Sequence, residues 1–464
     1  MLNPGSIIVL LLVLFQSIRC KDMLQFSTFL FLDAIAFALL VNSGYFIKIG
    51  SIELQYEEFL MLLYLFISFL LIGSIKVNLA TFTNGLLLLT VTLFGIYLLV
   101  IHPDQQSMVV PIGASWDAMF FGENVMRPLS FSTNNLERVI RIVLFVFLGT
   151  IARDISVSHE NLISRAILFI TTVQMVIGFI DFFTKIVLNI PVLPVVSARI
   201  FGVGSSQYSA LAFRGGIPSI QGFMKEASHF ACSFFPGLTY LALTWNKTRK
   251  MVIVEFLSVL ILFLSGSFTG FAIILYWGVL HVYKFIVSSR LGKLPSLIIS
   301  AGTLFLVFEV VQMLSEEFPI LQYYISRAYS VLGIGPSVGS EPIRLMSITY
   351  SIDLFMKYPL FGIGIGSSIA HGFIPNLLSN IGIIGFLTWL SFSFNAFLIT
   401  FKVNYIPIVS IFLLFMCFIG DIGWAYNMMG ISMLLGLNIG MNGMDTMRKN
   451  KASTAHTTLI DKEA

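Results

Sequence analysis

Long apolar segments separated by shorter polar ones follow one another through almost the whole chain, and this pattern predicts membrane-spanning helices. A helix needs about 17–25 mostly apolar residues to cross a bilayer. Windows of that kind predict about 12–13 spans, near residues 6–18, 24–41, 59–75, 79–101, 139–151, 162–183, 230–245, 251–265, 269–286, 294–313, 377–401, 406–419 and 431–441. We therefore expect an all-α polytopic membrane protein with a single transmembrane domain over residues 1–446.

The composition supports this expectation. Hydrophobic residues make up 57% of the chain and charged residues 11%, and the mean hydropathy is +0.92. Soluble domains carry about 25% charged residues, so an ordinary soluble protein is excluded. The three cysteines, Cys20, Cys232 and Cys417, lie far apart in apolar surroundings, which argues against a disulfide framework or a thiolate metal site. The formal net charge of +4 does not indicate a nucleic-acid partner.

The placement of the basic residues predicts the orientation of the connectors. Lys and Arg collect in short connectors such as 247–250 and 284–293, which we expect to face the cytoplasm. The longer connectors then face outward, and two of them, near 188–228 and 314–376, are long enough to contain short helices. Residues 447–464 are polar and predict a disordered cytoplasmic tail.

The longest outer loop carries a helix signal followed by a glycine run. Pro342 suits a first turn and Pro359 a stop, so residues 342–357 predict a helix. Glycine then recurs at alternate positions, at Gly362, Gly364 and Gly366. Glycines let the backbone approach a ligand closely and present amide N–H groups to an anion.

Two serines and a histidine complete this stretch. Ser367 is a candidate ligand-binding hydroxyl, and His371 stands just before the next helix as a candidate general base. The alternative is a histidine at the membrane interface without a chemical role. Gly382 and Gly385 follow one turn apart, where small residues permit close helix packing.

Basic side chains in the outer loops are candidates for binding a negatively charged substrate. Guanidinium groups match phosphate or diphosphate with two hydrogen bonds. The alternative for each is an arginine exposed to water or bound to a lipid headgroup. The candidate arginines are Arg199, Arg214, Arg327 and Arg344.

A further polar cluster lies where the loop near 188–228 enters the next span. It contains Lys225, Glu226, Ser228 and His229. Charged groups entering a membrane need partners or a wet cavity. Glu226 could act as a base, bind the acceptor sugar, or pair with Lys225 or an arginine. The turn 265–270, rich in serine and glycine, is interpreted as structural.

Other kinds of site are not indicated. The sequence contains no P-loop and no closely spaced His, Asp and Glu set typical of a metal site, so we expect neither a metal nor a cofactor. Acidic residues within the spans form no pattern typical of a proton relay, which leaves a transporter poorly supported. They are Asp33, Asp181, Glu255, Glu309 and Asp421.

Several of these stretches together resemble the O-antigen ligase and O-antigen polymerase superfamily of bacterial envelope enzymes. The resemblance rests first on Arg344 followed by Lys357-Tyr358-Pro359-Leu360-Phe361-Gly362-Ile363-Gly364-Ile365-Gly366, and on His371 with Gly382 and Gly385 after it. Gly222-Phe223-Met224-Lys225-Glu226-Ala227-Ser228 resembles a stretch common in the polymerase members, and the turn 264–270 resembles the serine-rich turn that follows it. The likeness covers roughly residues 214–385.

This resemblance implies a glycosyltransferase with the C-type membrane fold. Its substrate would be an oligosaccharide linked to undecaprenyl diphosphate, used at the outer, periplasmic face of the bacterial plasma (inner) membrane. The arginines, Lys225 and the glycine amides would stabilise the leaving diphosphate, and His371 or Glu226 would orient or deprotonate the acceptor hydroxyl. Inversion by a single displacement without a metal is expected.

The resemblance does not decide which acceptor molecule receives the glycan. A Wzy-type polymerase of O-antigen or capsule would join repeat units, and the 225–228 stretch favours it. A ligase would move the finished glycan to lipid A core or to a protein. A polysaccharide flippase or another transporter is the less favoured alternative, and a purely structural membrane protein is a further one. Besides the lipid bilayer, the resemblance implies a chain-length regulator and a flippase as partners.

Overall fold

The computed structural model describes residues 3–398 apart from short internal gaps. The gaps are residues 42–43, 50–51, 71–78, 113, 159, 204–212, 215, 245–246, 289–293, 296–297, 300–301, 303–308, 310–311 and 332–340. The spans predicted near 406–419 and 431–441 and the tail 447–464 lie outside the described residues, as does most of the span predicted near 294–313.

The chain begins with three helices and a hairpin. These elements are α1 (Pro4–Arg19), α2 (Met23–Leu40), the antiparallel pair β1 (Tyr45–Ile49) and β2 (Ile52–Gln55), and α3 (Tyr56–Leu70). The side chains of Asn3 and Asp22 accept backbone N–H groups at the starts of α1 and α2. Such caps satisfy donors that a helix start leaves open.

The middle of the chain alternates long helices with small irregular elements. It contains α4 (Leu79–Ile101), β3 (Met108–Val109), α5 (Trp116–Phe120), β4 (Arg127–Pro128), α6 (Thr133–Ser158), α7 (Glu160–Val187), α8 (Val192–Phe201), β5 (Phe213–Arg214) and β6 (Ile217–Pro218). Strands β3 and β4 pair, as do β5 and β6. The outer loop predicted near 188–228 therefore contains a short helix, as expected.

The remaining described elements are helices. They are α10 (Ala227–Ser233), α11 (Phe235–Leu243), α12 (Arg249–Leu264), α13 (Phe268–Ser288), α15 (Pro319–Val331), α16 (Glu341–Lys357) and α17 (Phe373–Leu398). The helix predicted at 342–357 is confirmed as α16. The span predicted near 230–245 consists of two helices, α10 and α11, which meet at Phe234. Pro236, in the first turn of α11, lacks an N–H group and interrupts the hydrogen bonding of the helix that starts upstream.

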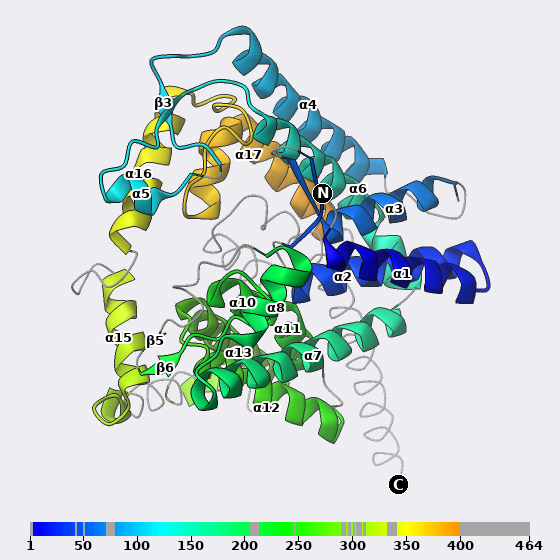
Figure 1. Cartoon of the computed structure of the whole chain (residues 1–464), viewed down its shortest axis with the longest axis vertical. Helices are drawn as coiled ribbons and strands as arrows, with labels where there is room; N and C mark the ends of the chain where they lie inside the picture. Colours follow the sequence, from blue (N-terminus) through cyan, green and yellow to red (C-terminus); the bar gives the residue numbers. More distant parts are fainter. Residues whose placement is uncertain are drawn as a thin grey trace, which may run out of the picture.

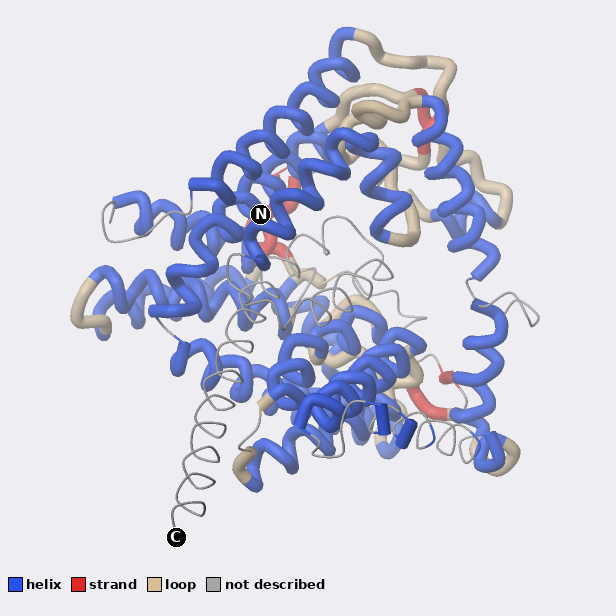
Figure 2. The backbone as a smooth tube through the Cα atoms, turned by 180° about the vertical axis from the view of Figure 1, so that it is seen from behind, coloured by secondary structure: helices blue, strands red, loops and turns tan. Residues whose placement is uncertain are grey.

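Helices of distant sequence position pack together (Figure 1). Helix α17 packs on α4, α4 on α6 and α16 on α17, in the part of Figure 1 that also contains α5 and β3. Helices α7, α10, α11, α12 and α13 pack in the other part, and α15 contacts α13 at its edge. Figure 2 shows the same arrangement from behind, with helix predominating and only short strands.

The helices define the class of protein. Within the described part of the chain, five helical segments are long and apolar enough to cross a membrane, namely Met23–Leu40, Leu79–Ile101, Arg165–Val187, Phe268–Ile286 and Phe373–Ser393. These segments and the composition are those of a helical membrane protein. The number is lower than the 12–13 predicted spans. Helices α1, α3 and α12 have only 16, 15 and 16 residues, and 16 residues extend about 24 Å against a hydrocarbon core of about 30 Å.

Candidate functional site

Helix α17 is interrupted at Gly382, and the segment before the glycine run is docked into the break. Gly382 has φ 67° and ψ −174°. The N–H of Ile383 donates to the Pro359 carbonyl at 2.8 Å instead of continuing the helix. The carbonyl of Ser379, which a regular helix would pair with Ile383, accepts the N–H of Ile363 at 2.9 Å. The loop thus accepts a backbone hydrogen bond from α17 and donates another one to it.

Glycine is needed on both sides of this contact. A Cβ atom on Gly362 would lie 2.6 Å from the carbonyl oxygen of Ser379, and one on Gly382 would lie 2.5 Å from the backbone nitrogen of Phe361. Both glycines also have positive φ, where L side chains are strained. The expectation that Gly382 permits packing between helices is therefore corrected, because its close neighbour is the loop backbone.

Two buried asparagines hold the rest of the glycine run. The side-chain oxygen of Asn380 in α17 accepts the N–H of Gly366 at 3.1 Å, and its Nδ2 donates to the Ser368 carbonyl at 3.1 Å. From α6, Nδ2 of Asn135 donates to the Ile365 carbonyl at 2.8 Å and to the hydroxyl of Ser367 at 2.9 Å. Buried polar groups need such partners, so this loop is a fixed scaffold.

These contacts correct part of the predicted anion site. The amides of Gly362 and Gly366 donate within the protein, to the Tyr358 carbonyl and to Asn380. Ser367 is buried and its hydroxyl donates to the Ile363 carbonyl at 2.8 Å. These three residues therefore shape the loop. A role for Gly364 in binding stays a prediction.

The loop that contains the glycine run leads to His371, which contacts α16. Its Nδ1 lies 3.0 Å from the hydroxyl of Ser347, and its backbone N–H donates to the same hydroxyl at 3.0 Å. Ser347 is one helical turn after Arg344, whose carbonyl accepts the Ser347 hydroxyl at 2.8 Å. The half-buried imidazole of His371 therefore lies against the turn of α16 that follows the exposed Arg344. Sequence reasoning placed both residues in the site and missed Ser347, because a serine inside a helix has no distinctive spacing.

Residues of both outer loops contact the serine-rich turn or the end of α12 just before it. Nη1 of Arg214 donates to the Gly266 carbonyl at 3.4 Å. Tyr324 in α15 donates to the Phe263 carbonyl at 2.7 Å, and Arg327 lies buried one turn further along α15. The structural interpretation of the turn is thus supported by its contacts with Arg214.

Glu226 lies at the start of α10, where its carboxylate accepts the hydroxyl of Ser228 at 3.2 Å. Removal from water would by itself raise the pKa of Glu226. His229, Lys225, the Ser228 hydrogen bond and Arg214 outweigh that effect and lower this pKa below its ordinary value. Glu226 is therefore ionised at neutral pH, which suits a hydrogen-bond acceptor or a base.

A buried ion pair holds the segment before Glu226. Lys185 and Asp181 in α7 lie 3.0 Å apart, and neither side chain is exposed. Asp181 also accepts the amides of Gln221 and Gly222, at 2.8 and 3.0 Å, while Lys185 donates to the Ser219 carbonyl at 2.7 Å. The carboxyl group of Asp181 therefore serves to hold the structure together. In the sequence, the spacing of four residues between Asp181 and Lys185 is the signal that predicts this pair.

A second buried ion network was also missed. Arg141 in α6 contacts Glu58 of α3 and Glu137 of its own helix, each at 2.6 Å. The stem of Arg138, buried one turn earlier, lies against Gly366. This network joins the start of α6 to α3 beside the glycine run.

The structure does not gather all the predicted residues on the same elements. His371, Arg344 and the glycine run belong to α16, α17 and the loop between them, whereas Glu226, Arg214 and Arg327 belong to α10, β5 and α15 in the other part of the molecule (Figure 1). Arg199, in the last turn of α8, and Lys225 are exposed. A single site containing both groups stays a prediction.

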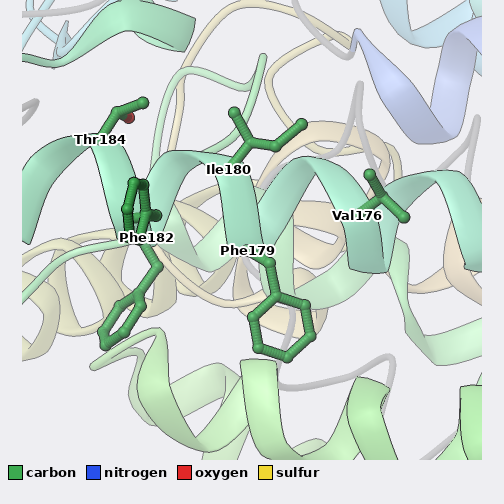
Figure 3. A pocket seen from close by; sticks show the side chains of 6 residues that line it. Val176, Phe179, Ile180, Phe182 and Thr184 are labelled. Carbon is green, nitrogen blue, oxygen red and sulfur yellow. The ribbon is translucent and has the colours of Figure 1, made fainter.

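An apolar groove contains none of the residues of either group. It follows α7 and is lined by Val176, Phe179, Ile180, Phe182, Phe183 and Thr184 (Figure 3). Because it lies on a segment apolar enough to cross a membrane, contact with lipid explains its character. Within the described residues, no group of three or more His, Cys, Asp and Glu side chains is arranged to hold a metal ion.

Models of known protein families do not match this chain, and no curated protein is significantly similar to it.

Proposed function

We propose that this membrane protein is a glycosyltransferase that uses a lipid-linked sugar donor. Within that class, we propose a polysaccharide polymerase of the O-antigen ligase and polymerase superfamily. It joins oligosaccharide repeat units carried on undecaprenyl diphosphate at the outer face of a bacterial plasma membrane. The observation that carries the proposal is the contact of His371 with Ser347, because it holds the imidazole against the turn of α16 that follows the exposed Arg344.

This pairing supplies the two functions that the reaction requires. The acceptor sugar hydroxyl attacks the anomeric carbon of the donor and loses its proton to His371. The bond from that carbon to the diphosphate oxygen breaks, and the diphosphate leaves with the electron pair. Arg344 stabilises the negative charge that develops on it. A single displacement of this kind inverts the anomeric configuration.

The other predicted residues act as a second group in this proposal. Ionised Glu226 accepts hydrogen bonds from the acceptor sugar, and Arg199, Arg214, Lys225 and Arg327 attract the diphosphate. Because these residues lie on α8 and α15, in β5 and just before α10, we propose that they hold the acceptor and the diphosphate of its own lipid carrier rather than the leaving diphosphate.

The test is the glycan pattern of the native host. A deletion strain should carry lipid A core with one repeat unit, and the wild-type gene on a plasmid should restore a ladder. Core without any repeat, together with accumulated lipid-linked polymer, would instead identify a ligase. An unchanged ladder in the deletion strain would refute both enzymes.

Point variants then test the site. His371→Ala and Arg344→Ala should abolish the ladder at matched protein level. Matched controls are His102→Ala and Arg127→Ala, which remove an exposed histidine after α4 and an exposed arginine in β4. Normal glycan from a site variant would remove that residue from the mechanism.

A further inference from the structure

The hydroxyl of Ser347 lies where three polar groups meet. The Arg344 carbonyl is 2.8 Å away, Nδ1 of His371 is 3.0 Å away, and the backbone N–H of His371 donates to the hydroxyl oxygen at 3.0 Å. Ser347 is fully buried. Water therefore does not compete for these hydrogen bonds.

The Ser347 hydroxyl has only one hydrogen to donate, and this determines which of its three contacts it donates to and which it accepts. A hydroxyl offers one hydrogen and two acceptor lone pairs. The hydrogen points to the Arg344 carbonyl, because two oxygens 2.8 Å apart without a hydrogen between them repel each other. One lone pair accepts the His371 amide. The other faces Nδ1, which must then carry a hydrogen and donate it.

We propose that Ser347 is a positioning residue that holds His371 in the tautomer with hydrogen on Nδ1. Nε2 then carries the basic lone pair. The catalytic consequence rests on the proposed function: Nε2 takes the proton of the acceptor hydroxyl as the new glycosidic bond forms and the bond to the diphosphate breaks. Nδ1–H keeps its hydrogen bond to Ser347 throughout, so the imidazolium formed is oriented as the imidazole was.

The surroundings give this contact its fixed geometry. Just before His371, the Ile369 carbonyl accepts the indole N–H of Trp116 at 2.9 Å, and the Ile369 amide donates to the Val110 carbonyl at 3.3 Å. The backbone of His371 is thus held on the loop side, while α16 holds Ser347.

The experiment is nitrogen NMR of the full-length protein, labelled with ¹⁵N histidine and reconstituted in lipid nanodiscs. The chain has six histidines, and His371→Gln identifies the signal to follow. Wild-type protein should show hydrogen on Nδ1 of His371. Hydrogen on Nε2 overturns the inference, and this result is read from the wild-type protein once the His371 signal is assigned.

Two variants separate the hydrogen bond from general packing. Ser347→Ala should shift His371 toward a mixture of tautomers. Ser351→Ala removes a buried hydroxyl one turn later, which donates to the Ser347 carbonyl at 2.9 Å, and should leave the His371 signal unchanged. An unchanged tautomer in Ser347→Ala, or an equal shift in both variants, contradicts the assignment.

Turnover distinguishes this inference from the proposed function. With lipid-linked saccharide extracted from the deletion strain, Ser347→Ala should lower kcat about 10- to 100-fold with little change in KM, because a misdirected tautomer impairs proton transfer. A tautomer shift with normal kcat refutes the positioning role. If wild-type protein shows the Nδ1 tautomer but forms no polymer, the proposed function fails and the hydrogen-bond assignment remains.

Discussion

The backbone of Gly382 in α17 lies directly against that of Leu360, so that a Cβ atom on Gly382 would overlap the Leu360 carbonyl group. The contact sits at the break in α17, and the glycine run starts two residues after Leu360. A break in a membrane helix is tolerated where its freed backbone groups find partners within the protein. The loop 359–363 supplies those partners.

Gly382→Ala should therefore destabilise the protein. The added methyl group overlaps backbone, and φ 67° with ψ −174° is a conformation essentially restricted to glycine. We expect a loss of about 1–3 kcal/mol or more, measured by thermal unfolding in detergent. Gly278→Ala in α13 is the matched control, because nothing lies within 4 Å of its Cβ position. Equal stability of the two variants would contradict the docked loop.

Asn380→Ala should weaken the scaffold of the glycine run. It leaves the buried N–H of Gly366 and the carbonyl of Ser368 without their partner. Such a loss costs about 1–3 kcal/mol, and glycan polymerisation should fall with it because the same loop leads to His371. Asn395→Ala, on the same helix, loses only a bond to the Ser391 carbonyl and serves as control. A normal ladder and normal thermal stability for Asn380→Ala would show that the loop holds without it.

The carboxylate of Asp104 should make stability depend on pH in the acid range. Hydrogen bonds from Ser107, Tyr358 and Lys357 lower the pKa of Asp104. A folded-state pKa below the unfolded value means that the stabilisation is complete above about pH 4 and is lost as the pH falls through the folded-state pKa.

Asp104→Asn should then lower the melting temperature at pH 7, and its difference from wild type should shrink as the solution is acidified. Asp117→Asn changes an exposed carboxylate of α5 and should have no comparable effect at any pH. A melting-temperature difference between Asp104→Asn and wild type that grows toward low pH would contradict the lowered pKa of Asp104.

Replacing only one partner of the buried ion pair Asp181 and Lys185 should strongly lower the free energy of unfolding. Lys185→Met leaves the buried Asp181 carboxyl group without its cation, which costs about 3–5 kcal/mol. The double variant with Asp181→Leu should cost less than the sum of the single variants. Lys48→Met removes a half-exposed partner of Glu53 and should cost less than about 1 kcal/mol. Additive effects in the double variant would show that the buried pair is not coupled.

The site shows where prediction from residue patterns succeeds. Prolines at 342 and 359 bound α16 as expected, because proline acts through local backbone geometry. The glycine run was predicted to contact something closely, and it does. Its partner was predicted to be an anion, and at Gly362 and Gly366 it is the protein's own backbone and Asn380. Positive φ is a local property, but what occupies the space beside it depends on distant segments.

The sequence by itself determined the class of protein and most of the helices that the structure describes, because apolar length and proline positions act within one segment. Only the tertiary structure decided that Ser347 contacts His371, that α17 opens at Gly382 to receive residues 359–363, and that Asp181 accepts the amides of Gln221 and Gly222. It also divided the predicted site residues between α16–α17 and the elements around α10. Such contacts join residues that are far apart in the sequence, for example Asn135 and Ser367, and their hydrogen bonds form only once packing has brought the segments together and removed water.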